Sequence, residues 1–458
     1  LKAVKLNPDL GEAYSNMGNC LKDQSRVTEA ITAYRMALEC HTPKKSQIHS
    51  NLIFTIHLDP ASTPETIHRE LLQWNHLYAS PLKKFIRSHT NNRDPLRRLK
   101  IGYIPPDLRG HSADFLDPLL SNHDHSQFEI FCYAAIANPD IVTERFRNYS
   151  DHWHNVVGMT DEKLIEQIRQ DQIDVLVDLK LHAADNRLLV LARKPAPIQV
   201  TWAGYPSSTG LDSVDYRFSD PYLDPPETDL SVYSEQTIRL PETWWCYIPQ
   251  PKEPYNLDLP RMKNGFITFG CLNNFSKIND GVWQLWAKVL VAVPDSQLIV
   301  LTPQGEARQE LIEKLKKTGI DSRRVMFMDY MPRKQYLESF GRIDISLDPF
   351  PYNGHITSLD SLYMGVPVIT LVGKTAVGRG GVSILTNVGL PELIAQTPEE
   401  YVDIATKLAG DLPRLTELRK TLRDRMKNSP LMDAKRFAHN IEAAYRKMWR
   451  KWCTQTQP

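Results

Sequence analysis

The stretch IDISLDPFPYNGHITSLDSLYMGVPVITLVG, residues 343–373, places a helical pattern between two apolar runs. IDISLD and PVITLVG are predicted strands, and ITSLDSLYMG is the predicted helix that connects them. A strand, a crossover helix and a second strand form a right-handed unit with parallel strands. The loop PFPYNGH follows the first strand at its carboxyl end, where ligands bind in open α/β sheets. The stretch therefore predicts a doubly wound α/β domain with a ligand site.

The same alternation of strand and helix patterns fills two blocks of the chain. The first block holds the apolar runs LKIGYI, FEIFCYAA, IDVLVDL, IQVTWAG and VDYRFS, and the second holds GFITFGCL, SQLIVL, RVMFMD, IDISLD and PVITLVG. Such runs are typical of parallel strands that are covered on both faces. The Pro-rich segment PQPKEPYNLDLP separates the blocks and predicts a linker. We therefore expect two doubly wound, Rossmann-like domains that face a cleft.

The N-terminal segment NPDLGEAYSNMGNCLKDQSRVTEAITAYRMALE has the spacing of a 34-residue tetratricopeptide repeat. Gly18 and Ala30 are small enough for two helices to approach closely, and Tyr14 and Tyr34 fill the groove between them. A single repeat cannot bury its own faces, which predicts the remnant of a longer array. An ordinary helical hairpin is the alternative.

These patterns predict an order of domains along the chain. The expected boundaries are a tetratricopeptide-repeat remnant at 1–60, a helical linker at 61–97, an N-terminal Rossmann-like domain at 98–248, a linker at 249–262, a C-terminal Rossmann-like domain at 263–430 and a C-terminal helix at 431–458.

The composition of the chain limits which partners and which cellular compartment are expected. The chain has 55 basic and 54 acidic side chains and a net charge of +1, so neither nucleic acid nor a membrane is expected as a partner. The six cysteines are scattered without a CxxC pair, which favours reduced thiols. We find no signal peptide and no apolar run that could span a bilayer, so a cytoplasmic location is expected.

The absence of several motifs makes some kinds of ligand site less expected. The sequence has no Asp-x-Asp, no GxGxxG and no GxxxxGK[ST], which disfavours a nucleotide sugar held by a metal, a dinucleotide site and a P-loop. Closely spaced histidines in NHDHS and DHWHN lack partnering cysteines or an HExxH motif. We therefore expect no metal site and no cofactor.

The loop and helix start at 348–373 have the residue types that a nucleotide diphosphate needs. A helix N-terminus offers free N–H groups and a positive dipole, and Gly354 permits close approach of the backbone. His355 can donate to a diphosphate oxygen, Thr357 adds a hydroxyl, and Asp360 can accept from a sugar hydroxyl. For His355, simple capping of the helix is the alternative. Lys277, in FGCLNNFSKIND, is either a phosphate contact or a solvated surface lysine.

The first block has two further candidate loops. GYIPPDLRGHSADFL places His111 after the first strand, as a general base or a group that orients the substrate, although a satisfied loop histidine is equally compatible. WAGYPSSTG follows a later strand and could line the cleft with N–H groups. His182, in VDLKLHAADNRLL, is a weaker candidate of the same kind.

Several segments together carry a resemblance to a known family. RGHS, RKPAPIQVTWAGYPSSTG, DYRFSD, NNFSKI, DPFPYNGH and LYMGVPVITL resemble the bacterial-type O-linked N-acetylglucosamine (O-GlcNAc) transferases, which carry tetratricopeptide repeats, over essentially the whole chain. The resemblance implies the GT-B fold, in which an N-terminal acceptor-side domain and a C-terminal donor domain face a cleft. It also implies UDP-N-acetylglucosamine as donor, no required metal, inversion at the anomeric carbon, and Ser/Thr hydroxyls of proteins or peptides as acceptors.

The resemblance implies roles for individual residues. The implied catalytic residues are His111 and Lys277, and the implied donor-binding residues are Gly204, Pro206, Asn274, Lys277, Arg333, Gly354, His355, Ile356, Thr357 and Asp360.

The implied chemistry divides these residues between the two ends of the donor. Lys277 holds the diphosphate and stabilises the leaving group, with an amide contact from Asn274. At the nucleoside end, Asp360 binds the ribose and Arg333 borders the uracil. His111 is implied as base or acceptor-site group.

Departures from the family pattern leave two alternatives open. Ile356 replaces a usual threonine, and the segment after His111 is one residue shorter than usual. SPINDLY-like proteins, which transfer fucose from GDP-fucose, resemble the chain almost as well. A non-catalytic repeat scaffold that only binds nucleotide is the other alternative.

Overall fold

The computed structural model describes residues 9–104, 111–249 and 258–455, with the backbone alone at 111–113. The chain folds into two compact units. The first unit comprises Leu1–Ile48, Thr55–Thr63 and Pro249–Met432. The second unit comprises His49–Phe54, Pro64–Ile248 and Asp433–Pro458.

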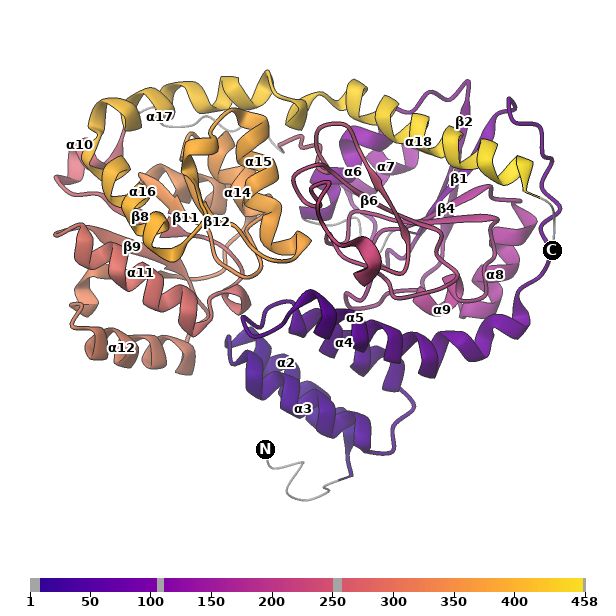
Figure 1. Cartoon of the computed structure of the whole chain (residues 1–458), viewed down its shortest axis with the longest axis horizontal. Coiled ribbons are helices and arrows are strands. Elements are labelled where there is room, and N and C mark those ends of the chain that lie inside the picture. Colours follow the sequence, from indigo (N-terminus) through magenta and orange to yellow (C-terminus); the bar gives the residue numbers. More distant parts are fainter. Residues whose placement is uncertain (1–8, 105–110, 250–257, 456–458) are drawn as a thin grey trace. The chain divides into compact units, whose positions relative to one another are not determined.

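Each unit is built on one parallel sheet (Figure 1). The strands of the second unit are β1 Leu99–Ile104, β2 Phe128–Ala134, β3 His152–Asn155, β4 Val175–Asp178, β5 Ile198–Thr201, β6 Tyr216–Ser219 and β7 Gln236–Arg239. The strands of the first unit are β8 Thr268–Cys271, β9 Gln297–Leu301, β10 Val325–Met328, β11 Ile345–Leu347, β12 Val368–Leu371 and β13 Ile394–Ala395. All ten apolar runs predicted as strands contain an observed strand.

Helices connect and cover the strands. They are α2 Gly11–Asp23, α3 Val27–Glu39, α4 Lys45–Ile56, α5 Pro64–Trp74, α6 His111–Leu120, α7 Ile141–Tyr149, α8 Asp161–Gln170, α9 Leu188–Leu191, α10 Pro260–Asn264, α11 Asp280–Ala292, α12 Glu306–Thr318, α13 Arg333–Ser339, α14 Ile356–Tyr363, α15 Gly380–Val388, α16 Pro398–Gly410, α17 Leu412–Lys427 and α18 Ala434–Thr454. Short helical turns lie at Asn75–Ala79, Ser80–Phe85, Leu230–Val232, Phe275–Lys277, Ser322–Arg324, Phe340–Arg342, Ala376–Arg379, Pro391–Leu393 and Pro430–Met432.

The two sheets have the same doubly wound strand order. In the second unit the order is β3-β2-β1-β4-β5-β6-β7, and in the first it is β10-β9-β8-β11-β12-β13. In both, the chain moves outward over three strands and then returns to the other side of the starting strand, as in Rossmann folds. The reversal lies between β1 and β4 in one sheet and between β8 and β11 in the other. The α/β fold class predicted from the sequence is confirmed.

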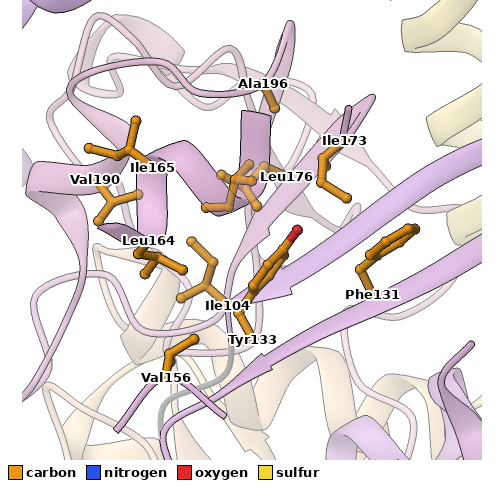
Figure 2. Close-up of a cluster of buried hydrophobic side chains, with 11 residues drawn as sticks. Ile104, Phe131, Tyr133, Val156, Leu164, Ile165, Ile173, Leu176, Val190 and Ala196 are labelled. Carbon is orange, nitrogen blue, oxygen red and sulfur yellow. The ribbon is translucent and has the colours of Figure 1, made fainter. Parts of the chain in front are cut away.

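The core of the second unit shows why these apolar runs form strands. Side chains of β1, β2 and β4 meet side chains of α8 and α9 in a buried cluster (Figure 2). Leu164, Ile168, Leu176 and Val190 have no exposed surface. A parallel sheet needs such cover on both faces, and α18 packs against α6 in the same unit. Tyr445 of α18 lies 3.2 Å from Tyr103 of β1, hydroxyl to hydroxyl.

The predicted repeat helices are present as α2 and α3, drawn in indigo in Figure 1. Tyr34 is fully buried, and its hydroxyl donates to Asn19 Oδ1 at 2.7 Å. Its ring lies against Gly18, where a Cβ atom would stand 2.7 Å from the nearest ring carbon. The small residue that the repeat pattern requires is therefore needed for the close approach of α2 to α3.

Substituting Gly18→Ala is expected to lower the free energy of unfolding by about 1–3 kcal/mol, because the added methyl overpacks the Tyr34 ring. Urea denaturation followed by circular dichroism would measure the change. Gly341→Ala is the matched control, since a Cβ atom there meets nothing within 4 Å. Equal stability of the Gly18→Ala and Gly341→Ala variants would show that the ring moves aside without cost.

Candidate donor site

The loops that follow β8 and β11 lie side by side at the reversal of strand order in the first unit. β8 and β11 pair directly, with Phe269 opposite Ile345 and Gly270 opposite Ser346. Ligands of doubly wound sheets bind at the carboxyl ends of strands at such a reversal. The loop after β8 carries Asn274 and Lys277, and the loop after β11 carries the NGH motif, residues 353–355. The sheet therefore brings together two sequence stretches that were predicted separately to bind a diphosphate.

Lys277 ends the short helical turn Phe275–Lys277, here called the lysine turn. Its ammonium group donates to the carbonyl oxygen of Asn353 at 2.6 Å and lies 4.3 Å from the centre of the Tyr352 ring. Burial lowers the pKa of Lys277 to about 8, although the nearby Asp348 carboxylate opposes this shift. A cation of lowered pKa held at a sheet reversal is typical of a functional site.

Asp348 organises the loop after β11. Its carboxylate accepts hydrogen bonds from the Gly354 amide at 2.7 Å, the Ser358 hydroxyl at 3.1 Å and the Thr370 hydroxyl at 2.8 Å. Burial raises its pKa to about 6, opposed by these donors and by Lys277. The sequence analysis did not select Asp348. Its position directly after a predicted buried strand was the available signal.

His355 precedes the first residue of α14 with φ 53° and makes no side-chain capping bond to the helix. His355 is thus the N-cap residue of α14, but its side chain is engaged elsewhere. Its Nε2 lies 2.9 Å from the carbonyl oxygen of Val377, and because a carbonyl can only accept, we assign the ring proton to Nε2. Burial, aided by the charge of Lys277, lowers the pKa of His355 to about 3. The imidazole is therefore neutral near pH 7, with its Nε2 proton already engaged.

The remaining candidates beside Lys277 have distinct surroundings. Gly354 is buried, and a Cβ atom there would stand 2.3 Å from Ser358 Oγ, so the loop requires glycine. Ile356 and Thr357 open α14 and are half-buried. Asn274 is exposed, and its side-chain oxygen accepts from the Ser276 amide at 3.0 Å to start the lysine turn.

Arg333 of α13 and Asp360, one turn into α14, form an ion pair. Both guanidinium nitrogens of Arg333 donate to the Asp360 carboxylate at 2.6 Å. The Tyr336 hydroxyl also donates to Asp360, at 3.1 Å, and Asp360 has no exposed surface. The family resemblance implied contacts of Arg333 with the uracil and of Asp360 with the ribose, and the structure shows that the two side chains are bound to each other.

The second unit holds two of the implied donor-binding residues, Gly204 and Pro206, and the implied catalytic residue His111. Gly204 is exposed and Pro206 buried in the loop that follows β5. Gly204 lies against the Lys180 backbone, where a Cβ atom would stand 2.7 Å from the carbonyl carbon. His111 is the first residue of α6, and its side chain lies outside the described part of the chain.

His182 has a structural role in the second unit. It is fully buried, and its Nε2 lies 2.9 Å from the carbonyl oxygen of Thr209, so Nε2 carries the proton. The Ser50 hydroxyl therefore donates to Nδ1, at 2.9 Å. The edge of Trp74 packs on the ring at 5.1 Å. Both ring nitrogens are engaged in holding α4 and the β5–β6 connection in place.

The described residues offer neither a metal site nor a membrane-spanning helix. No group of three or more His, Cys, Asp or Glu side chains in the described ranges is placed to hold a metal ion. Within the same ranges, no helix combines the length and the apolar character needed to cross a bilayer.

Comparison with known proteins gives the same fold. A lysine-to-methionine mutant of the O-GlcNAc transferase of Thermobaculum terrenum has a solved structure that is 37% identical, with a TM-score of 0.92 over 98% of this chain and 86% of that chain. The fold is the GT-B fold that the sequence predicted. The model of glycosyl transferase family 41 matches residues 76–249 and 255–441. The chain belongs to this family.

Curated relatives include plant proteins of two names. A probable UDP-N-acetylglucosamine–peptide N-acetylglucosaminyltransferase named SPINDLY, from Arabidopsis thaliana, is 40% identical over 81% of this chain and 42% of its own length. A relative named SEC, from the same plant, is 30% identical over 79% of this chain and 38% of its own length. The chain thus spans less than half the length of these relatives.

Proposed function

We propose that the chain transfers N-acetylglucosamine from UDP-N-acetylglucosamine to Ser or Thr hydroxyls of proteins or peptides, with inversion and without a metal ion. The observation that carries the proposal is the lysine turn beside α14 at the sheet reversal, with the ammonium of Lys277 2.6 Å from the Asn353 carbonyl. Family membership and the names of the relatives support the choice of donor and acceptor.

In the proposed reaction the acceptor oxygen attacks the anomeric carbon of the sugar. The bond between that carbon and the β-phosphate oxygen breaks, and its electron pair stays on UDP. The proton of the acceptor hydroxyl passes to a base, for which His111 is the candidate named from the sequence. Direct displacement of this kind inverts the anomeric carbon.

The leaving diphosphate needs its growing negative charge stabilised. Without a metal, the charge falls to Lys277 and to the N-terminus of α14. Thr357 in the first turn of α14 and Asn274 at the start of the lysine turn are proposed to add neutral donors. Because His355 is neutral, we assign it no role in supplying charge. Its proposed roles are to shape the loop and to contact the sugar donor.

The direct test is a transfer assay on the purified chain. UDP-N-acetylglucosamine and GDP-fucose are supplied separately with a broad protein mixture, and mass spectrometry looks for added HexNAc or deoxyhexose on Ser and Thr. HexNAc that disappears in a Lys277→Met variant supports the proposal. Binding of UDP without transfer to any acceptor would instead favour the nucleotide-binding scaffold.

GDP-fucose is kept as the second donor for a specific reason. The relatives named SPINDLY are 36–40% identical to this chain, against 30% for the relative named SEC. Deoxyhexose transfer in the same assay would move the chain to the SPINDLY-like alternative.

The rate of donor turnover is expected to fall with rising pH above about 8. The folded-state pKa of Lys277 is lowered from 10.5 to about 8, so its charge is present below that pH and lost above it. We expect kcat/KM for the donor to fall about tenfold per pH unit on this limb, because it reports ionisation in the free protein. A bound diphosphate favours the charged lysine, so kcat alone should fall at higher pH.

Lys277→Arg is the matched control for this pH profile, because a guanidinium stays charged over the range. Donor hydrolysis, followed as release of UDP between pH 6 and 10, should lose the limb near pH 8 in this variant. If the limb persists in Lys277→Arg, another group titrates and the assignment to Lys277 is wrong.

A further inference from the structure

The repeat segment contacts the lysine turn within the first unit. The hydroxyl of Ser25, in the turn between α2 and α3, donates to the carbonyl oxygen of Ile278 at 2.7 Å, across 253 residues of sequence. Ile278 follows Lys277 directly, and its side chain is 3% exposed. The hydrogen bond thus ends on the carbonyl of the residue that follows the lysine that we place at the donor diphosphate.

Charged neighbours of Ser25 face the same part of the first unit. Burial, with a smaller contribution from the charge of Asp23, raises the pKa of Tyr330, whose hydroxyl lies 3.5 Å from the Phe275 amide of the lysine turn. Arg26 is paired mainly with Glu29 and is also within electrostatic reach of Glu306 and Glu310 on α12. Asp23, Ser25 and Arg26 of the repeat turn therefore each interact with groups elsewhere in the first unit.

Ser25 holds its position in an unfavourable backbone conformation. Its φ is 62°, in the left-handed region that glycine adopts freely and other residues rarely do. The turn around it is closed by backbone bonds from Ser25 N to Lys22 O and from Arg26 N to Leu21 O, both 2.9 Å. A glycine would relax this turn, so the backbone conformation does not explain why serine is present. The hydrogen bond from the Ser25 hydroxyl to the Ile278 carbonyl does explain it.

The lysine turn is held from the other side by the loop that follows β11. Asn279 Nδ2 donates to the carbonyl oxygen of Phe350 at 2.6 Å, and Lys277 donates to that of Asn353. Ser25 therefore supplies one of the fixed points between which Lys277 is held. Motion of the repeat turn would be transmitted to the residue next to the lysine.

We propose that the α2–α3 turn of the repeat is a positioning element of the donor site, with Ser25 as its positioning residue. The repeat segment then affects donor chemistry directly, beside any part it has in holding acceptors. A partner that moves α2 would change donor turnover without contacting the donor. This inference rests on the proposed role of Lys277.

Ser25→Gly tests the link because it removes the hydroxyl and relieves the strain, so the fold is kept. Hydrogen exchange measured by mass spectrometry should become about three- to tenfold faster at residues 275–279, which corresponds to the net loss of one hydrogen bond. Exchange in β9 should stay unchanged. UDP affinity and acceptor-free hydrolysis of UDP-N-acetylglucosamine should fall by a similar factor, about three- to tenfold. Thr32→Ala, which removes an exposed hydroxyl bonded within α3, is the matched control and should change none of these.

A double-mutant cycle separates positioning from general damage to the fold. In a Lys277→Met background, Ser25→Gly should have no further effect on hydrolysis, because the residue it positions is gone. An undiminished effect in that background overturns the inference, as does unchanged exchange at residues 275–279. If Lys277→Met itself leaves UDP binding and hydrolysis unchanged, the proposed function fails and the inference fails with it.

Discussion

Replacing Lys277 with methionine is expected to lower donor turnover at least roughly a hundredfold, the effect of removing one preorganised donor from a developing oxyanion. The ammonium lies at the reversal of the β8–β11 sheet and is the cation that the two diphosphate loops share. Methionine keeps the apolar length of the side chain against Tyr352 but supplies neither charge nor proton. UDP affinity should fall less than turnover, because charge on the leaving oxygen is greatest in the transition state.

Initial rates of UDP release and UDP titration calorimetry measure the two effects separately. Lys288→Met is the matched control, because Lys288 is an exposed lysine on α11 of the same unit and should leave both rates and affinity unchanged. Turnover near that of the unmodified chain in Lys277→Met would remove the assignment of the leaving-group role.

The strands that the sequence predicted are those that lie in apolar runs. β1, β2, β4 and the strands of the first unit up to β12 were all found in apolar runs. β3, with the sequence His-Trp-His-Asn, β7 and the two-residue β13 were missed. All three lie at a sheet edge, where one side of the strand is open and an apolar run is not required. The fourth edge strand, β10, was predicted because its residues Val-Met-Phe-Met are apolar. The edge strands that were missed are therefore those too polar or too short to form an apolar run.

The site could be located from the sequence, but its internal bonds could not. The rule that ligands bind at carboxyl ends of strands selected the loops of Lys277 and His355, and the strand order brings these loops together. The rule does not show that the Nε2 proton of His355 is bound to Val377, or that Asp348 holds the Gly354 amide. These bonds depend on the path of the backbone. Ser25 was invisible for the same reason, since its partner lies 253 residues away.

The second large effect is expected from a substitution at Asp360, at the proposed nucleoside end of the site. Asp360→Ala is expected to lower UDP affinity about ten- to hundredfold, the range for losing a hydrogen bond to a charged group. It should also lower the free energy of unfolding by about 3 kcal/mol, because it leaves Arg333 without its carboxylate. The low end of the range for broken buried pairs applies, since the Arg333 side chain is 26% exposed.

Tyr336→Phe is the matched control, because it removes one hydroxyl bond to Asp360 and leaves the pair with Arg333 intact. Its expected cost is about 0.5–1.5 kcal/mol of stability, with little change in UDP affinity. Titrations with UDP and GDP, beside urea denaturation, measure both quantities for each variant. If Asp360→Ala loses stability but binds UDP as well as the unmodified chain, the carboxylate only positions Arg333. The ribose contact inferred from the sequence would then be wrong, and the guanidinium of Arg333 would be the group to test against the base.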